Sequence, residues 1–103
     1  MPSSVTEPQD LCSVRLKALA DPTRLAVVRR LLDGGPGYVG AINESLGLDQ
    51  SLLSHHLKVL REAGLVEAER EGKAVRYRLA DGVDAQQAGG EMLDLGCCKL
   101  EFD

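Results

Sequence analysis

The spacing of apolar residues changes once along this chain, at Gly64, from a period of about 3.6 residues to a period of two. Before Gly64, apolar residues recur three and four positions apart, which is typical of helices with one buried face. After Gly64, apolar and charged residues alternate, which is typical of a half-buried β-hairpin. Such a hairpin can bury its apolar face only against the helices, so the pattern predicts a mainly α fold with a small β-hairpin.

Prolines and glycines delimit the expected helices. One helix begins at Pro8, and a second begins at Pro22, where Asp21 can act as the N-cap and proline suits the first helical position. A short helix is expected over Val39–Leu46, and a longer one follows over Gln50–Ala63.

The last two helices are joined by a short turn that contains Gly47, which we expect in a left-handed conformation. Two short helices joined in this way describe a helix-turn-helix. The hairpin that follows has expected strands near 66–70 and 75–79 around a Glu71-Gly72-Lys73 turn. A hairpin directly after the second helix predicts a winged helix-turn-helix.

We divide the chain into a flexible N-terminal tail (1–7), a winged helix-turn-helix domain (8–80) and a C-terminal tail (81–103). The C-terminal tail carries a pair of cysteines and is expected to serve sensing, dimer contacts or both. Within it, residues 93–102 favour an extended segment, while residues 82–90 combine helix formers with glycines and stay open.

Composition and charge exclude several classes of protein. The chain has 103 residues, which is enough for one domain, and 3% aromatic residues argue against an all-β sandwich. No apolar run approaches the roughly 18 residues of a membrane span, and the polar N-terminus lacks a leader pattern, so we expect a cytoplasmic protein. Neither a glycine-rich phosphate loop nor a nucleophile elbow is present, so we expect no enzyme.

The charge is unevenly distributed. The net charge is −4, yet residues 50–78 hold 6 Lys and Arg against 4 Asp and Glu, while residues 79–103 hold 1 against 6. A basic middle segment suits a nucleic-acid partner, which the acidic average conceals.

Three motifs coincide with those of a known family. They are Leu19-Ala20-Asp21-Pro22-Thr23-Arg24, the run from Leu46 to Val66 that contains Ser54-His55-His56-Leu57, and Arg70-Glu71-Gly72-Lys73 with Tyr77. With these motifs the chain resembles the ArsR/SmtB family of bacterial metal- and thiol-sensing repressors over residues 16–79. The resemblance implies a homodimer that represses transcription by binding double-stranded operator DNA and releases it when an inducer binds.

The candidate DNA contacts lie on the fourth helix and on the hairpin. Amides and hydroxyls can read base edges in the major groove, and lysine and arginine can contact phosphates. The residues are Gln50, Ser51, Ser54, His55, Lys58 and Arg61 on the helix, and Lys73 and Arg76 on the hairpin. The alternative for the helix is a merely solvated face. The alternative for Arg76 and Arg78 is cross-strand pairing with Glu67 and Glu69.

The cysteines are the candidate inducer site. Tyr38-Val39-Gly40 stands where many family members have a Cys-Val-Cys box, and the tail has no histidine for a zinc site of the family's other type. What remains is the adjacent pair Cys97 and Cys98, with Cys12 as a possible third ligand. Arsenic-responsive relatives with relocated cysteines make this departure compatible with arsenic sensing. Soft thiolates bind trivalent arsenic and antimony, and no resident cofactor is expected.

Other functions fit the same residues. The cysteines could bind cadmium or lead, or one of the pair could join Cys12 on oxidation or persulfide formation. The fold could also serve as a protein-interaction module that does not bind DNA, which the acidic tail would suit. His55 and His56 are adjacent on a helix and point about 100° apart, so they are not expected to share a metal ion.

Overall fold

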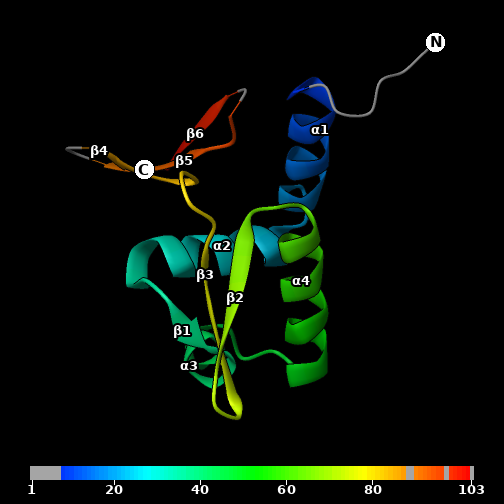
Figure 1. The fold of residues 1–103 in the computed structure, drawn as a ribbon, viewed down its shortest axis with the longest axis vertical. Helices are drawn as coiled ribbons and strands as arrows, with labels where there is room; N and C mark the ends of the chain where they lie inside the picture. Colours follow the sequence, from blue (N-terminus) through cyan, green and yellow to red (C-terminus); the bar gives the residue numbers. More distant parts are fainter. Residues whose placement is uncertain (1–7, 88–89, 97, 103) are drawn as a thin grey trace.

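The computed structural model describes residues 8–87, 90–96 and 98–102 (Figure 1). The elements in chain order are α1 (Pro8–Leu19), α2 (Pro22–Gly34), β1 (Gly37–Tyr38), α3 (Val39–Leu46), α4 (Gln50–Glu62), β2 (Val66–Glu71), β3 (Ala74–Leu79), β4 (Asp84–Gln87), β5 (Gly90–Asp94) and β6 (Lys99–Phe102). The helices come first and a β-hairpin follows α4 directly, so the expected winged helix-turn-helix is confirmed. None of the described helices has the length and apolar character needed to cross a membrane.

Side-chain caps fix where the helices begin. The Asp21 carboxylate accepts hydrogen bonds from the backbone N–H groups of Thr23 and Arg24 at 2.7 and 3.1 Å, as expected of an N-cap. These bonds stabilise the ionised carboxylate, the one from Arg24 most strongly, and they lower the pKa of Asp21.

The turn between α3 and α4 is held by one side chain. Gly47 has φ 65° and ψ 33°, the left-handed conformation that the sequence predicts. The Asn43 side chain accepts a hydrogen bond from the Leu48 N–H at 2.8 Å and donates one to the Leu48 carbonyl at 2.7 Å. This pair of bonds closes the turn and therefore fixes the angle at which α4 leaves α3.

The hairpin belongs to a three-stranded sheet of order β1-β3-β2. Tyr77 on the central strand β3 lies opposite Gly37 of β1 on one side and opposite Ala68 of β2 on the other. The two-residue strand β1 was not predicted, because so short a segment has no readable period. It ties the start of α3 to the hairpin, so the helix-turn-helix and the hairpin form one unit.

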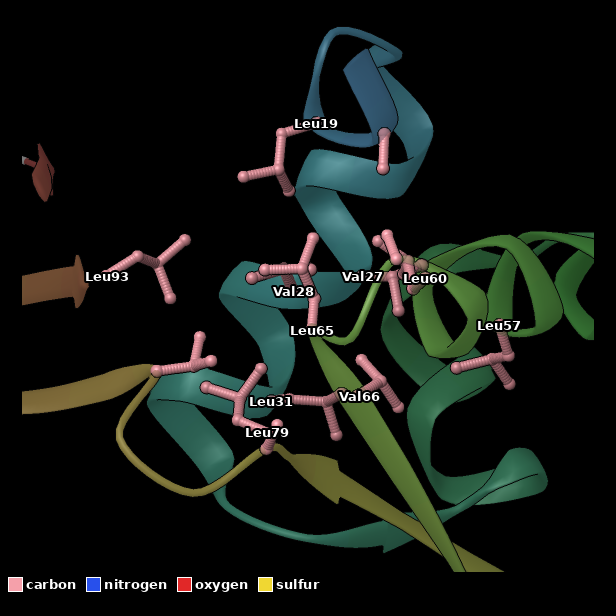
Figure 2. Packing of buried hydrophobic residues seen from close by; sticks show 14 of the residues in the cluster. Leu19, Val27, Val28, Leu31, Leu57, Leu60, Leu65, Val66, Leu79 and Leu93 are labelled. Atoms are coloured by element: carbon pink, nitrogen blue, oxygen red, sulfur yellow. The ribbon is translucent and has the colours of Figure 1, made fainter. Parts of the chain in front are cut away.

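One hydrophobic core joins all parts of the chain (Figure 2). Val27 and Val28 from α2 and Leu57 from α4 are fully buried, and Leu65 closes the core at the start of the hairpin. Leu93, on β5, points toward α2 from the other side and is also fully buried (Figure 2). The C-terminal segment therefore contributes side chains to the core.

The C-terminal segment forms a second antiparallel sheet of order β4-β5-β6. The extended conformation expected over residues 93–102 is confirmed in part: 93–94 and 99–102 are in strands, and the chain reverses between them, with Gly96 at φ 94°. Residues 84–87, where the sequence offered helix formers, are a strand, because β5 provides hydrogen-bond partners along their whole length.

Helix α1 buries only some of its apolar side chains. Cys12, Ala18 and Leu19 are buried, whereas Val14 is 49% exposed and Leu16 is 42% exposed. The part of α1 that enters the core is therefore narrower than its apolar residues alone indicate.

Candidate nucleic-acid interface and cysteine site

The polar face of α4 is open to solvent. The side chains predicted to contact DNA are all exposed: Gln50, Ser51, Ser54, His55, Lys58 and Arg61. The opposite face is fully buried through Leu53, Leu57 and Leu60. Asp49 caps the helix by accepting a hydrogen bond from the Ser51 N–H at 2.8 Å. The helix thus presents a mainly polar surface, which also includes the exposed side chain of Leu52.

Lys73 and the N-terminal end of α4 lie at the same end of the molecule. Lys73 is exposed in the turn between β2 and β3. Figure 1 shows this turn and the first residues of α4 projecting in the same direction, away from the second sheet. A nucleic-acid duplex lying against that end can therefore meet both elements.

The hairpin arginines lie among carboxylates. Arg76 donates a hydrogen bond to Glu69 at 3.3 Å, and its Nε lies 3.3 Å from a Glu71 oxygen without hydrogen-bond geometry. Arg78 binds Glu67 at 2.5 Å and Asp81 at 3.0 Å, and the Asp81 hydrogen bond is the main cause of its raised pKa. The cross-strand pairing that the sequence left open is therefore present for both arginines.

Tyr38 occupies the first position of the family's cysteine box and binds the hairpin. Its hydroxyl donates a hydrogen bond to a Glu71 carboxylate oxygen at 2.5 Å. The bond to this anion raises the pKa of Tyr38, because ionising the phenol would place two negative charges together. The side chain therefore ties the start of α3 to the hairpin.

The two histidines of α4 lie in different environments. His55 is exposed on the polar face, whereas His56 is 7% exposed. The Nδ1 atom of His56 lies 3.5 Å from Nη1 of Arg24. His56 therefore packs at the junction of α4 with α2 and cannot share a metal ion with His55.

The structure brings two of the three cysteines together. The Sγ atoms of Cys12 on α1 and Cys98 before β6 are 3.8 Å apart, although 86 residues separate them in the sequence. Cys12 is 6% exposed and Cys98 is exposed. Cys97 lies outside the described residues. Cys12 is disulfide-bonded in this structure, and within the described ranges no three His, Cys, Asp or Glu residues gather as a metal site.

One residue at this end of the molecule was missed by the sequence reasoning. Arg15 donates hydrogen bonds to three backbone carbonyls, those of Leu95 at 3.0 Å and of Ala63 and Gly64 at 3.4 Å each. The sequence held one indication that Arg15 makes internal contacts, because it lies three residues after Cys12 on the side of α1 that faces the core.

An exposed polar helix after a tight turn, with a hairpin beside it, defines the winged helix-turn-helix class of nucleic-acid-binding proteins. Comparison with known proteins specifies the family. Residues 21–68 match the model of the family described as "Bacterial regulatory protein, arsR family". The chain belongs to this family of regulatory proteins, which are not enzymes.

Individual relatives agree with this assignment. The HTH-type transcriptional regulator CmtR of Mycobacterium tuberculosis is 49% identical over 73 residues, which are 71% of this chain and 61% of the relative. The chain thus spans less than two thirds of the length of such curated relatives.

Two solved structures carry the fold comparison. A homodimeric winged helix-turn-helix DNA-binding domain from Mycobacterium bovis has a TM-score of 0.64 at 39% identity, covering 70% of this chain and 66% of that one. A protein described as "Possible transcriptional regulator for arsenical resistance" has a TM-score of 0.60 at 37% identity, covering 65% of this chain and 69% of that one.

Proposed function

We propose that the chain is a transcriptional repressor that binds double-stranded operator DNA as a homodimer in the cytoplasm. The exposed polar face of α4 supplies base contacts, and the hairpin turn lies where it can meet the adjacent backbone. A dimer would place two copies of α4 in successive major grooves, about 34 Å apart. The exposed apolar side chains Val14 and Leu16 on α1 suit contacts between subunits. The homodimeric M. bovis relative supports the same assembly.

The inducer that we propose is trivalent arsenic or antimony, bound by Cys98 and Cys12 with Cys97 as a further ligand. The observation that carries this proposal is the 3.8 Å separation of the Cys12 and Cys98 sulfurs. Cys12 is disulfide-bonded in this structure, so one soft ion would bond to the two sulfurs once that disulfide is reduced. The relative described as a regulator for arsenical resistance supports arsenic over other soft ions.

The two kinds of arsenic inducer differ in the number of thiolates that they can bind. A methylated trivalent arsenical has two open positions and needs two thiolates, whereas arsenite can use three. Cys12→Ser and Cys98→Ser each leave two cysteines, so each should impair the response to arsenite more than the response to the methylated form.

The proposal is tested by measuring DNA affinity with and without arsenite. An operator duplex is first selected by the wild-type protein from a random-sequence pool, and its Kd is then measured by fluorescence anisotropy. The wild type should release the duplex on arsenite addition, and Cys98→Ser should keep it. Ser13→Ala, an exposed change next to Cys12, is the matched control and should respond like wild type. Release of DNA from Cys98→Ser by arsenite would refute the ligand assignment.

A second candidate inducer is thiol oxidation. It is favoured by the state of Cys12, which is disulfide-bonded in this structure, with Cys98 in non-bonded contact at 3.8 Å. Arsenite binds only thiols, so the two inducers require opposite redox states of Cys12. Intact-mass spectrometry of the protein as it leaves DNA separates them: arsenic adds mass, whereas a disulfide within the chain removes two hydrogen atoms.

A further inference from the structure

Leu52 is a large apolar side chain on the otherwise polar outer surface of α4, and it is 45% exposed. A single exposed leucine is common on protein surfaces, so exposure alone indicates no function. The other large apolar side chains that are exposed in the described part of the chain have contacts assigned to them. Val14 and Leu16 suit contacts between subunits, and the Tyr38 hydroxyl binds the hairpin. Leu52 therefore needs an explanation of its own.

The core does not require an apolar residue at position 52. Leu53, Leu57 and Leu60 form the inner face of α4, and all three are fully buried. Because successive helix residues are rotated by about 100°, Leu52 points roughly 100° away from the centre of that face. Truncating its side chain should therefore leave the packing of the core intact.

Leu52 lies where the proposed DNA surface begins. It is the third residue of α4, and Figure 1 shows this end of the helix projecting in the same direction as the hairpin turn. Residues three positions apart on a helix are neighbours, with about 5–6 Å between their Cβ atoms. Leu52 is therefore beside His55, which is also exposed. An apolar group and an N–H donor thus lie next to each other on this surface.

Thymine is the base that matches such a pair of groups. In the major groove, thymine presents its O4 acceptor and its 5-methyl group, cytosine presents an amino donor, and neither purine carries a methyl group. A neutral imidazole has one N–H donor, which can bond to O4. A leucine side chain can cover the methyl group beside it. Thymine alone of the four bases offers an acceptor and an apolar group together.

We propose that Leu52 and His55 together recognise one thymine in each half of the operator, with Leu52 covering the 5-methyl group and His55 donating a hydrogen bond to O4. This inference rests on the proposed function, because it names a base that the operator contains at the contact. Leu52 is a specificity-determining residue in this scheme, and removing one methyl group from water should strengthen binding by about fourfold.

Deoxyuridine provides the test for Leu52, because uracil lacks only the methyl group of thymine. An operator duplex is selected by the wild type from a random-sequence pool. Each thymine is then replaced in turn by uracil in both halves, and Kd is measured by fluorescence anisotropy. For the wild type, one replacement should weaken binding by about 15-fold, because two methyl groups are lost. Leu52→Ala should bind the thymine and uracil duplexes within about twofold of each other, because alanine is too short to cover the methyl group.

Leu52→Met is the matched control for the alanine variant. Methionine keeps a long apolar side chain and should keep most of the wild-type preference for thymine over uracil. Alanine and methionine both favour helices, and the site is exposed, so both variants should fold like wild type.

Cytosine at the same position tests His55. Cytosine lacks the methyl group, as uracil does, but it presents an amino donor where uracil presents O4. The wild type should therefore bind the uracil duplex at least about fivefold more tightly than the cytosine duplex. His55→Ala should lose this preference, whereas Leu52→Ala should keep it.

The outcomes separate this inference from the proposed function. If no uracil replacement weakens wild-type binding by more than about twofold, the methyl contact is wrong and the proposed function stands. A full wild-type preference for thymine over uracil in Leu52→Ala would overturn the role of Leu52. An unchanged preference for uracil over cytosine in His55→Ala would overturn the role of His55. A wild type that selects no duplex over random DNA would overturn the proposed function and this inference together.

Discussion

Replacing Lys73 by alanine should reduce the salt dependence of DNA binding, whereas replacing Arg76 should change it much less. Lys73 is exposed at the tip of the hairpin, and no ion pair is found for it among the contacts of the described residues. Arg76 lies 3.3 Å from both Glu69 and Glu71. To contact a phosphate, Arg76 would have to leave these carboxylates, which would then repel the same phosphate.

The size of the effect follows from counter-ion release. Each phosphate neutralised by a cationic side chain contributes about 0.9 to the slope of log K against log salt concentration on B-form DNA. A dimer carries two hairpins, so Lys73→Ala should reduce the magnitude of the slope by about 1.8. Between 50 and 200 mM salt, that difference corresponds to about a 12-fold smaller loss of affinity. Arg76→Ala should change the slope by less than about half as much.

Fluorescence anisotropy of a labelled operator duplex at four KCl concentrations measures these slopes. Both variants should keep the same preference for operator over random duplex, since phosphate contacts carry no sequence information. Equal slopes for wild type and Lys73→Ala would refute the placement of the hairpin turn on the DNA backbone. A larger change for Arg76→Ala would show that the ion pairs open on binding.

Three further changes test other parts of the structure. Ser54→Ala or His55→Ala should weaken operator binding by about 1–3 kcal/mol and leave random-duplex binding unchanged, which competition anisotropy measures. Leu93→Ala, at a fully buried site, should lower the free energy of unfolding by about 2–5 kcal/mol in urea titrations. Asp21 has a lowered pKa, so its cap stabilises the protein above the ordinary carboxyl pKa and is lost as pH falls through the folded value. Asp21→Asn should therefore be less stable than wild type at pH 7, and the difference should shrink at pH 3.

The helices were predictable because their ends are marked by local chemistry. The Asp21 cap, the left-handed Gly47 and the proline at the start of α2 act within a few residues of the chain, and each was found where the sequence places it. The hairpin was predictable for the same reason, since its turn glycine and its period of two are local signals.

The second sheet could be predicted only in part. Leu93, Leu95 and Cys97 alternate as in a strand, and Leu93, Cys97 and Leu100 also fit a helix, so periodicity alone could not decide. The outcome depended on a pairing partner, because β5 lies between β4 and β6 and bonds to both. The residues of β4 have helix-forming side chains but form a strand, because tertiary contacts can override helix propensity.

The spatial arrangement of the cysteines could not be predicted from the sequence for a related reason. Three cysteines can be counted, but the approach of Cys12 to Cys98 depends on how the second sheet packs beside α1. Arg15 escaped notice because its partners are backbone carbonyls, which leave no mark on the sequence. The signals available were its spacing from Cys12 on α1 and the neighbouring glycines Gly64 and Gly96.

The hydrophobic core connects the C-terminal segment to α4. Leu93 and Leu95 of the C-terminal segment are buried in the same cluster as Leu57 and Leu60 of α4. A core packed at crystal-like density does not absorb a displacement locally but passes it to its neighbours. A segment that moved Cys98 would therefore disturb the packing of α4.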